Sequence, residues 1–426
     1  MSARARSTTR EQVDVCLDAD IMESLCRVGT LFHAASRGDS VFSFAYDPAW
    51  LRRPNVFEID PDLQLHDAES YPSHPVGAFR IFMDSAPDRW GRLLLDRREP
   101  LRAREEGRAA RALTEWDYLL GVHDSCRMGA LRFRRNADSP FLDDDHELAA
   151  PPIASLRELQ AASLALEEPG SDETPQFRQW LAALLVPGSS LGGARPKANF
   201  THPQGALWIA KFPSREDRRD VGAWEMVVHE LARRSGLNIP DAQLLSLGSR
   251  HRTFACRRFD RLAGGRRRFF VSGMTLLNRS DGENASYLEL AEFLGMRGTP
   301  AGKREDLREL WTRVVFNILV SNRDDHLRNH GFILAEDGWR LSPAFDLNPN
   351  VDRASHQLAI DTGDATPDVE LALSTAEFYG LDDNEAARIL ERVRAAVRDW
   401  RSVASSNRLP RAETELMAQA FAAADP

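Results

Sequence analysis

The chain has 426 residues, of which 42% are hydrophobic, and a formal net charge of −9. A chain of this length exceeds what one compact core accommodates, so we expect two or three domains or lobes. The acidic balance argues against a protein that coats nucleic acid through bulk electrostatics, and no apolar run approaches the ~18 residues that a membrane-spanning helix needs.

The cysteines and the first residues indicate a compartment. Four scattered cysteines without a CxxC pair predict neither a disulfide framework nor a zinc site. The basic opening residues are followed by acids rather than by the apolar stretch of a signal peptide. A cytoplasmic location is therefore expected.

The first third of the chain has a mixed α and β pattern and no catalytic cluster. Val41–Tyr46 and Ala130–Phe133 are expected to be strands, and Phe79–Arg97 an amphipathic helix. Over 136–175 the composition shifts to acids, proline and serine around one short helix, Leu156–Glu167. That composition is typical of a surface linker.

A glycine turn follows in SSLGGARPKA, residues 189–198. Adjacent glycines permit close approach of the backbone to a ligand and leave amide N–H groups free for phosphate oxygens. The segment is not a Walker A loop, because Ala198 follows Lys197. An ordinary turn is the alternative interpretation.

Lys211 lies among apolar neighbours in the strand expected at Ala206–Phe212. A half-buried ammonium needs an opposite charge, since its desolvation is costly. The helix expected at Trp224–Ser235 supplies Glu225 for this purpose, with Glu230 as the alternative. Three further strands are expected at Leu244–Leu247, Thr253–Phe259 and Arg267–Val271. Together with the strand at Ala206–Phe212 they would form a β-meander.

The segment Ser321–Asp346 concentrates the polar residues. A helix with one apolar face from Leu307 to Ile318 leads into it, and a hairpin of Gly331–Leu334 and Trp339–Leu341 returns the chain to Asp346. The loop before the hairpin holds Asp324, Asp325, His326, Asn329 and His330. Such crowding beside apolar strands indicates metal binding, phosphate binding or both.

Together these elements make up the set of groups that phosphoryl transfer requires. Backbone amides, a lysine and metal ions must surround the transferred phosphate. One Asp orients the attacking hydroxyl and accepts its proton, while an Asn and a second Asp hold magnesium. In this chain those roles fall to Asp324, Asn329 and Asp346.

Several motifs resemble those of the HipA family, serine/threonine kinases that act as toxins of bacterial toxin–antitoxin pairs. They are SSLGGARPKA (189–198), IAKF (209–212), RRFDR (257–261), NRDDHLRNHGF (322–332) and SPAFDL (342–347). FAYDPAWL (44–51), DSAPDRWGRLLL (84–95) and DYLLGVHDSCRMGAL (117–131) extend the resemblance to the N-terminal part.

The resemblance implies an α+β, bilobal, protein-kinase-like fold with a β-rich small lobe and a mainly helical large lobe. We expect an N-terminal HipA-like subdomain at 1–135, a linker at 136–175, the small lobe at 176–262 and the large lobe at 263–426. The loop departs from ordinary kinases, because Asn322 and Arg323 precede Asp324 and His326 stands where a lysine is usual.

The resemblance also implies residue roles. The protein would be an ATP- and Mg²⁺-dependent serine/threonine kinase with Asp324 as the catalytic residue and Asn329 and Asp346 as metal ligands. The residues implied to contact ATP are Ser190, Leu191, Gly192, Gly193, Ala194, Arg195, Pro196, Lys197, Lys211, Arg257, Arg258, Phe259, His326, Arg328, Asn329 and Asp346. Autophosphorylation is implied at Ser190 or the adjacent Ser189, where the added charge would repel the phosphates of ATP.

The implied partners are a protein substrate, with translation factors as the class known for the family, and a small helix-turn-helix antitoxin. Any DNA association would run through that antitoxin. Two other functions stay open: a nucleotide-binding pseudokinase with a regulatory role, and a metal-dependent phosphohydrolase that uses Asp324, His326 and Asp346. The hydrolase leaves Lys211 and the glycine turn without a role.

Overall fold

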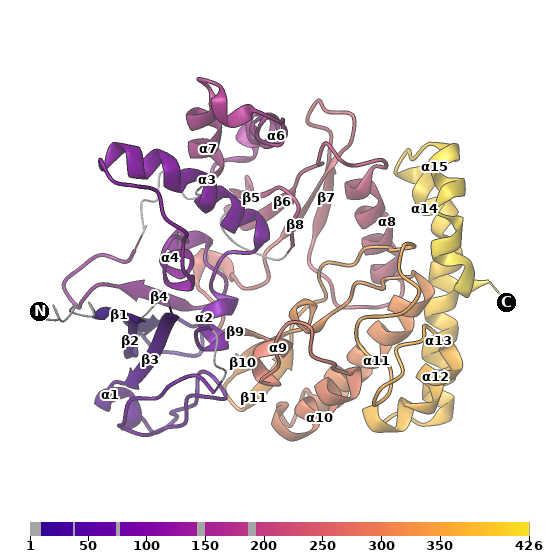
Figure 1. The fold of residues 1–426 in the computed structure, drawn as a ribbon. Coiled ribbons are helices and arrows are strands. Elements are labelled where there is room, and N and C mark those ends of the chain that lie inside the picture. Colours follow the sequence, from indigo (N-terminus) through magenta and orange to yellow (C-terminus); the bar gives the residue numbers. More distant parts are fainter. Residues whose placement is uncertain (1–9, 37–38, 74–76, 143–149, 186–192, 426) are drawn as a thin grey trace, which may run out of the picture.

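The computed structural model describes residues 10–36, 39–73, 77–142, 150–185 and 193–425. Ser189, Ser190, Leu191 and Gly192 of the glycine turn lie outside this part, so the predictions made for them stay predictions. Within it, an N-terminal region and a central region are each built on a sheet, and the C-terminal region is mainly helical (Figure 1).

The N-terminal region is built on an antiparallel sheet with the strand order β3-β2-β1-β4. The predicted strands at Val41–Tyr46 and Ala130–Phe133 correspond to β3 and β4, and alternate side chains of β4 are buried. The buried face packs against Phe79 and Phe82. The strands are β1 (Arg10–Leu17), β2 (Cys26–Ser36), β3 (Asp39–Tyr46) and β4 (Leu131–Arg134).

The prediction of one helix over Phe79–Arg97 is wrong. The structure has α2 (Arg80–Asp84) and α3 (Arg89–Glu105), with a break between them. Pro87 lies in the break and has no N–H with which to continue the helix. Asp88 then begins the second helix as its N-cap, accepting a hydrogen bond from the Gly91 N–H at 2.8 Å. The region also contains α1 (Pro48–Leu51) and α4 (Glu115–Leu120).

The central region is a sheet with the strand order β5-β6-β8-β7, in which α8 packs against β7 and β8. Helices α6 and α7 lie beside α3 (Figure 1) and share a core with it and with β5 and β6. The helix expected inside the 136–175 segment is therefore part of this core. The elements are α6 (Leu156–Leu166), α7 (Phe177–Leu185), β5 (Lys197–Thr201), β6 (Leu207–Lys211), α8 (Val221–Arg234), β7 (Ala242–Leu245) and β8 (Thr253–Arg257).

The strand expected at Arg267–Val271 does not extend the central sheet, contrary to the predicted meander. Instead β9 (Phe270–Ser272) pairs with β10 (Gly331–Ala335), and β10 pairs with β11 (Gly338–Leu341) as the predicted hairpin. The chain leaves the central sheet after β8 because the residues that follow are held by the N-terminal region.

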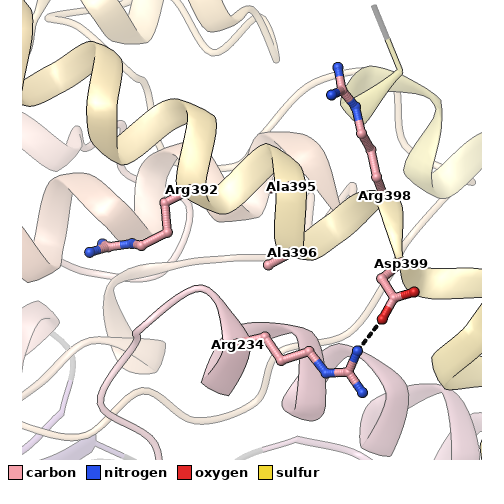
Figure 2. A pocket seen from close by; sticks show the side chains of 6 residues that line it. All are labelled: Arg234, Arg392, Ala395, Ala396, Arg398 and Asp399. Carbon is pink, nitrogen blue, oxygen red and sulfur yellow. Dashed lines mark hydrogen bonds and ion pairs between the residues drawn. The ribbon is translucent and has the colours of Figure 1, made fainter.

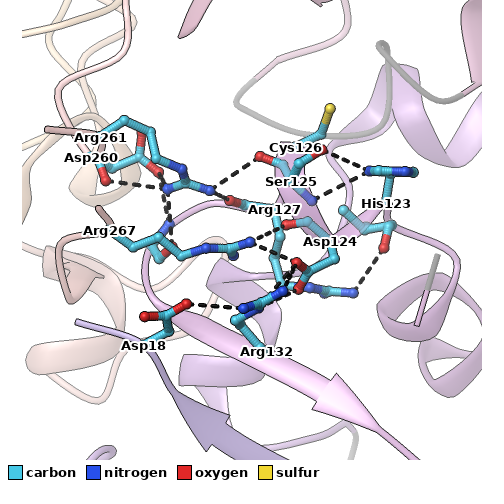
Figure 3. Close-up of polar contacts among 12 residues, drawn as sticks. Asp18, His123, Asp124, Ser125, Cys126, Arg127, Arg132, Asp260, Arg261 and Arg267 are labelled. Atoms are coloured by element: carbon cyan, nitrogen blue, oxygen red, sulfur yellow. Dashed lines mark hydrogen bonds and ion pairs between the residues drawn. The ribbon is translucent and has the colours of Figure 1, made fainter. Parts of the chain in front are cut away.

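A buried network of charges makes that connection (Figure 3). Asp260, whose side chain is 1% exposed, accepts hydrogen bonds from Arg258 at 2.7 and 2.9 Å and from Arg261 at 2.6 Å. Both arginines also donate to backbone carbonyls of residues 126–129, and Arg267 pairs with Asp124 at 2.7 Å. Burial lowers the pKa of Arg261 to about 9. Because each of these buried charges has an opposite charge or a backbone partner, the network ties the two regions together.

The C-terminal region packs its helices around α11, whose predicted apolar face is buried: Leu310 and Trp311 are 0% exposed. The sequence predicts two closing helices, near Asp383–Ser405 and Arg411–Ala423. The first is interrupted at Asp399, and the second gives way to a 3-10 turn over Ala418–Ala424. The helices are α9 (Gly273–Leu276), α10 (Tyr287–Arg297), α11 (Lys303–Leu319), α12 (Val369–Ser374), α13 (Asp383–Arg398), α14 (Trp400–Ser406) and α15 (Arg411–Leu416). Among the residues described, no helix combines the length and apolar character needed to cross a membrane.

Candidate active site

Lys211, the last residue of β6, joins two parts of the site that are far apart in the sequence. Its Nζ lies 2.5 Å from Oε1 of Glu225 on α8 and 2.7 Å from Oδ1 of Asp346. Burial alone would lower the pKa of Lys211, but the carboxylates of Asp346 and Glu225 raise it above its usual value. Glu230, the alternative partner, pairs instead with Arg234 on the same helix.

Asp346 is held in an unusual backbone conformation beside this lysine. Its φ is +58°, in the left-handed region that residues other than glycine rarely adopt. Asn348 donates to its Oδ1 at 3.1 Å. Burial opposes ionisation, but Lys211 holds the pKa of the Asp346 carboxyl below its usual value. Strain of this kind persists only where surrounding contacts impose it, and it concentrates at functional sites.

The loop after α11 separates one exposed carboxylate from one buried carboxylate. The side chain of Asp324 is 52% exposed and lies 2.9 Å from the guanidinium of Arg353. The Asp325 carboxylate is buried and accepts hydrogen bonds from Tyr287 at 2.6 Å and Asn317 at 2.9 Å, and it pairs with His330 at 2.7 Å. Asp325 and His330 therefore shape the loop from inside, which leaves Asp324 available to solvent.

Asn329 and Asp346, the residues expected to hold magnesium, offer donor groups of the kind that this ion takes. Mg²⁺ usually takes one or two carboxylates from the protein and keeps waters or phosphate oxygens as its other ligands. One carboxylate and one amide oxygen match that demand, and Asn329 also contacts the backbone of Asp324 through its Nδ2 at 3.5 Å. Within the described residues no three His, Cys, Asp or Glu side chains converge as a metal site, so the three-ligand cluster of the hydrolase alternative finds no support there.

Arg257, Arg258 and Phe259, three of the residues implied to contact ATP (at its adenine), divide between surface and interior. Arg257 is exposed, whereas the guanidinium of Arg258 is buried against Asp260 and Asn199 in the interface with the N-terminal region. The Phe259 ring lies 5.3 Å from the ring of Phe345, the residue next to Asp346. At Arg258 only the backbone is left for the role expected from the sequence.

Other residues expected to contact phosphate have protein partners. Arg195 pairs with Asp217 at 2.6 Å, and Arg328 pairs with Asp281. The side chain of Lys197 is 1% exposed and its Nζ lies 2.5 Å from Oδ2 of Asp88. His326 is half-buried, and its Nδ1 has no hydrogen-bond partner among the described residues.

Sequence reasoning missed Asp88 and Arg353. Asp88 lies within the quoted motif DSAPDRWGRLLL, where a proline followed by an Asp was available as a signal for a helix start. Arg353 carries no local signal, because its partner is fixed by how the chain returns after Asp346.

A separate, open cavity of about 620 Å³ lies between the end of α8 and α13, lined by Arg234, Arg392, Ala395, Ala396, Arg398 and Asp399 (Figure 2). Arg234 and Asp399 form an ion pair across it. The lining includes none of the residues expected to bind ATP or magnesium. The cavity is therefore not part of the candidate active site.

A sheet-based lobe whose strand lysine pairs with a helix glutamate, set against a helical lobe with an exposed Asp and a following Asn, defines a protein-kinase-like protein. The sequence profile of the HipA-like C-terminal domain matches residues 189–400, and that of the HipA N-terminal domain matches residues 19–134. The chain belongs to the HipA family, as the motifs predicted.

Three individual proteins are similar to this chain. The chain is similar to HipA of Shewanella oneidensis MR-1, solved in a complex with HipB and operator DNA, with a TM-score of 0.62 and 18% identity over 97% of this chain and 95% of that one. At this identity the likeness shows the fold, and it confirms the predicted α+β, kinase-like fold class. This chain is also 29% identical over 157 residues to "Putative kinase Y4dM" of Sinorhizobium fredii, and the match covers 34% of this chain and only 37% of that protein. The Helicobacter pylori proinflammatory kinase CtkA has a TM-score of 0.42 and 16% identity over 56% of this chain and 90% of that one.

Proposed function

We propose that this protein is an ATP- and Mg²⁺-dependent serine/threonine protein kinase of the HipA toxin type. The observation that carries the proposal is the contact of Lys211 with both Glu225 and Asp346. It brings the strand lysine of one lobe to the carboxylate of the other that we propose as a metal ligand, an arrangement that phosphoryl transfer from ATP requires and a hydrolase does not.

The residues divide the reaction among them. Lys211, oriented by Glu225, contacts phosphate oxygens of ATP, and Asn329 and Asp346 would hold the magnesium that neutralises charge on those phosphates. Asp324 orients the serine hydroxyl and accepts its proton. The serine oxygen then forms a bond with the γ-phosphorus as the bond from that phosphorus to the bridging oxygen breaks, and ADP leaves.

Two further parts of the proposal concern regulation and partners. Autophosphorylation of Ser190 or Ser189 would place nearly two negative charges beside the ATP site and inhibit it. The Shewanella relative was solved with HipB and operator DNA, which supports a helix-turn-helix antitoxin as partner here and DNA contact through that partner. A translation factor is the proposed class of protein substrate.

Incubation of the purified protein with Mg²⁺ and γ-labelled ATP tests the proposal. We expect label on Ser189 or Ser190, identified by mass spectrometry, and none in Asp324→Asn. Absence of ATP binding by calorimetry in both the phosphorylated and dephosphorylated protein would refute the kinase function. Binding of ATP without any phosphoryl transfer would favour the pseudokinase alternative.

A further inference from the structure

The segment from Asp84 to Gly91 belongs to the N-terminal region but contacts both lobes of the candidate active site. It contains the end of α2, the break at Pro87 and the start of α3. Its acidic residues, Asp84 and Asp88, lie on either side of the break. Asp84 accepts hydrogen bonds from the large lobe, and Asp88 forms an ion pair with the small lobe. The segment therefore lies where the two lobes meet.

On the small-lobe side, the start of α3 contacts both the side-chain ammonium and the backbone carbonyl of Lys197. Oδ2 of Asp88 lies 2.5 Å from the Lys197 ammonium, and the Trp90 indole N–H donates to the Lys197 carbonyl at 3.2 Å. The ammonium in turn donates to the carbonyl of Gly193 at 3.2 Å. The end of the glycine turn is thereby tied to a helix of the N-terminal region through Lys197.

The register of the small-lobe sheet explains why this lysine needs its own carboxylate. Lys197 on β5 pairs directly with Lys211 on β6. Side chains of directly opposed residues project from the same face of a sheet, with Cβ atoms about 5 Å apart, and like charges there repel each other. Asp88 neutralises Lys197, which leaves Glu225 and Asp346 to Lys211.

On the large-lobe side, Asp84 fixes the turn that packs against the loop after α11, called here the catalytic loop. It accepts from the backbone N–H of Ser272 at 2.8 Å and from the Ser272 hydroxyl at 2.7 Å. The next residue, Gly273, donates to the His330 carbonyl at 2.7 Å, and a Cβ there would lie 3.1 Å from the Leu327 carbonyl. The loop that contains Asp324 and Asn329 thus packs against a turn that Asp84 holds.

We propose that Asp84 and Asp88 are positioning residues for phosphoryl transfer, which makes the N-terminal region a working part of the kinase. Asp88 acts through Lys197 on the glycine turn and hence on ATP binding, whereas Asp84 acts through Ser272 on the catalytic loop and hence on the chemical step. The inference rests on the proposed kinase function. It also reassigns Lys197 from phosphate ligand to structural anchor.

Steady-state kinetics of Asp88→Asn and Asp84→Asn test the proposal. Asparagine serves as an N-cap as well as aspartate does, so Asp88→Asn keeps the start of α3 and removes only the charge. We expect Asp88→Asn to raise KM for Mg-ATP about tenfold, as loss of a charged hydrogen bond does, with a smaller change in kcat. Asp84→Asn is expected to lower kcat about tenfold with KM for Mg-ATP nearly unchanged. A purely structural role would move both constants together, or neither.

The matched control is Asp47→Asn. Asp47 is also an N-cap and also pairs with an arginine, Arg27, but both lie within the N-terminal region. This variant is expected to keep wild-type kcat and KM. Thermal unfolding of each variant establishes that it is folded before the kinetics are compared.

A double-mutant cycle of Asp88→Asn with Lys197→Met separates an anchor from a ligand. If Lys197 is an anchor, the double variant binds Mg-ATP about as weakly as the weaker single variant. Tighter ATP binding in Asp88→Asn together with a much larger loss in Lys197→Met would mean that Lys197 binds phosphate directly, and would overturn the inference. Wild-type kinetics in both Asn variants would overturn it while leaving the kinase function intact, whereas an inactive wild-type protein that binds no ATP would overturn both.

Discussion

Arg353 Nη2 lies 2.9 Å from Oδ1 of Asp324, so the carboxylate expected to receive the hydroxyl proton has a guanidinium partner. Arg353 follows Asp346 in the chain, and its backbone carbonyl accepts a hydrogen bond from Arg323, next to Asp324. A protein hydroxyl that approaches Asp324 competes with this guanidinium for Oδ1.

Removal of Arg353 is therefore expected to help the reaction modestly. Both side chains of the pair are about half exposed, and such pairs are worth at most about 1 kcal/mol. We expect Arg353→Gln to raise the rate of self-labelling by about two- to fivefold at saturating ATP, with KM for ATP unchanged. A loss of activity above tenfold would instead assign Arg353 to substrate or phosphate binding.

The partner of Lys211 can be tested against the alternative on the same helix. Glu225→Gln removes a buried carboxylate that orients Lys211, and a charge-assisted hydrogen bond of this kind is worth about 1.5–3 kcal/mol. We expect kcat/KM for ATP to fall by about 10- to 100-fold. Glu230→Gln, which affects only a surface pair with Arg234, is the control and should leave kcat/KM within about twofold.

The pH dependence of stability should contain a contribution from His356. Burial lowers the pKa of this histidine from 6.5 to about 4; Asp325 opposes the shift and Arg323 reinforces it. The folded state thus excludes a proton that the unfolded chain binds. The resulting stability is present above pH 6.5 and is lost as the pH falls toward 4.

Denaturant unfolding at pH 7 and pH 4.5 measures that contribution. We expect protonation of His356 to lower the free energy of unfolding of the wild type by about 2 kcal/mol between pH 7 and pH 4.5. In His356→Gln this pH-dependent loss should be absent. His66→Gln, at an exposed histidine, serves as the control. An identical pH dependence in His356→Gln and wild type would contradict the expectation.

Loss of one charge from the interface network should be costly. Asp260→Asn leaves the buried guanidiniums of Arg258 and Arg261 without their carboxylate, and breaking a buried pair in this way typically costs about 3–5 kcal/mol. The free energy of unfolding should fall by that amount. Asp399→Asn, at a surface pair with Arg234, should change it by less than about 1 kcal/mol.

Local rules were enough to predict the centre of the candidate site. A lysine inside an apolar strand needs a carboxylate, and the nearest helix offered Glu225, which the structure places 2.5 Å from it. The apolar face of α11 was visible from its period, and the crowding of acids and imidazoles identified the loop after it. The family and the kinase-like fold class, predicted from motifs, are confirmed.

Long-range partners were not predictable from the same rules. Asp88 and Lys197 are 109 positions apart. Their local sequence suggests a helix cap for Asp88 and a phosphate ligand for Lys197, and neither suggests an ion pair between the two. The strand at 270–272 carries no mark of its pairing with β10 rather than with β8. Arg258 was expected to contact ATP because it lies in the family motif RRFDR, but its guanidinium is buried against the carbonyl groups of residues 126 and 127.

The interface network sets a limit on how this protein can be divided. A fragment that begins near residue 150 would retain every residue expected to contact ATP or magnesium, although it would lack Asp84 and Asp88. It would keep Asp260 beside Arg258 and Arg261, but both arginines would lose their backbone carbonyl partners in residues 126–129. Arg267 would lose the carboxylate of Asp124. Such a truncated protein would have an exposed, positively charged surface that favours nonspecific binding. Experiments on it would report binding properties that the intact chain does not have.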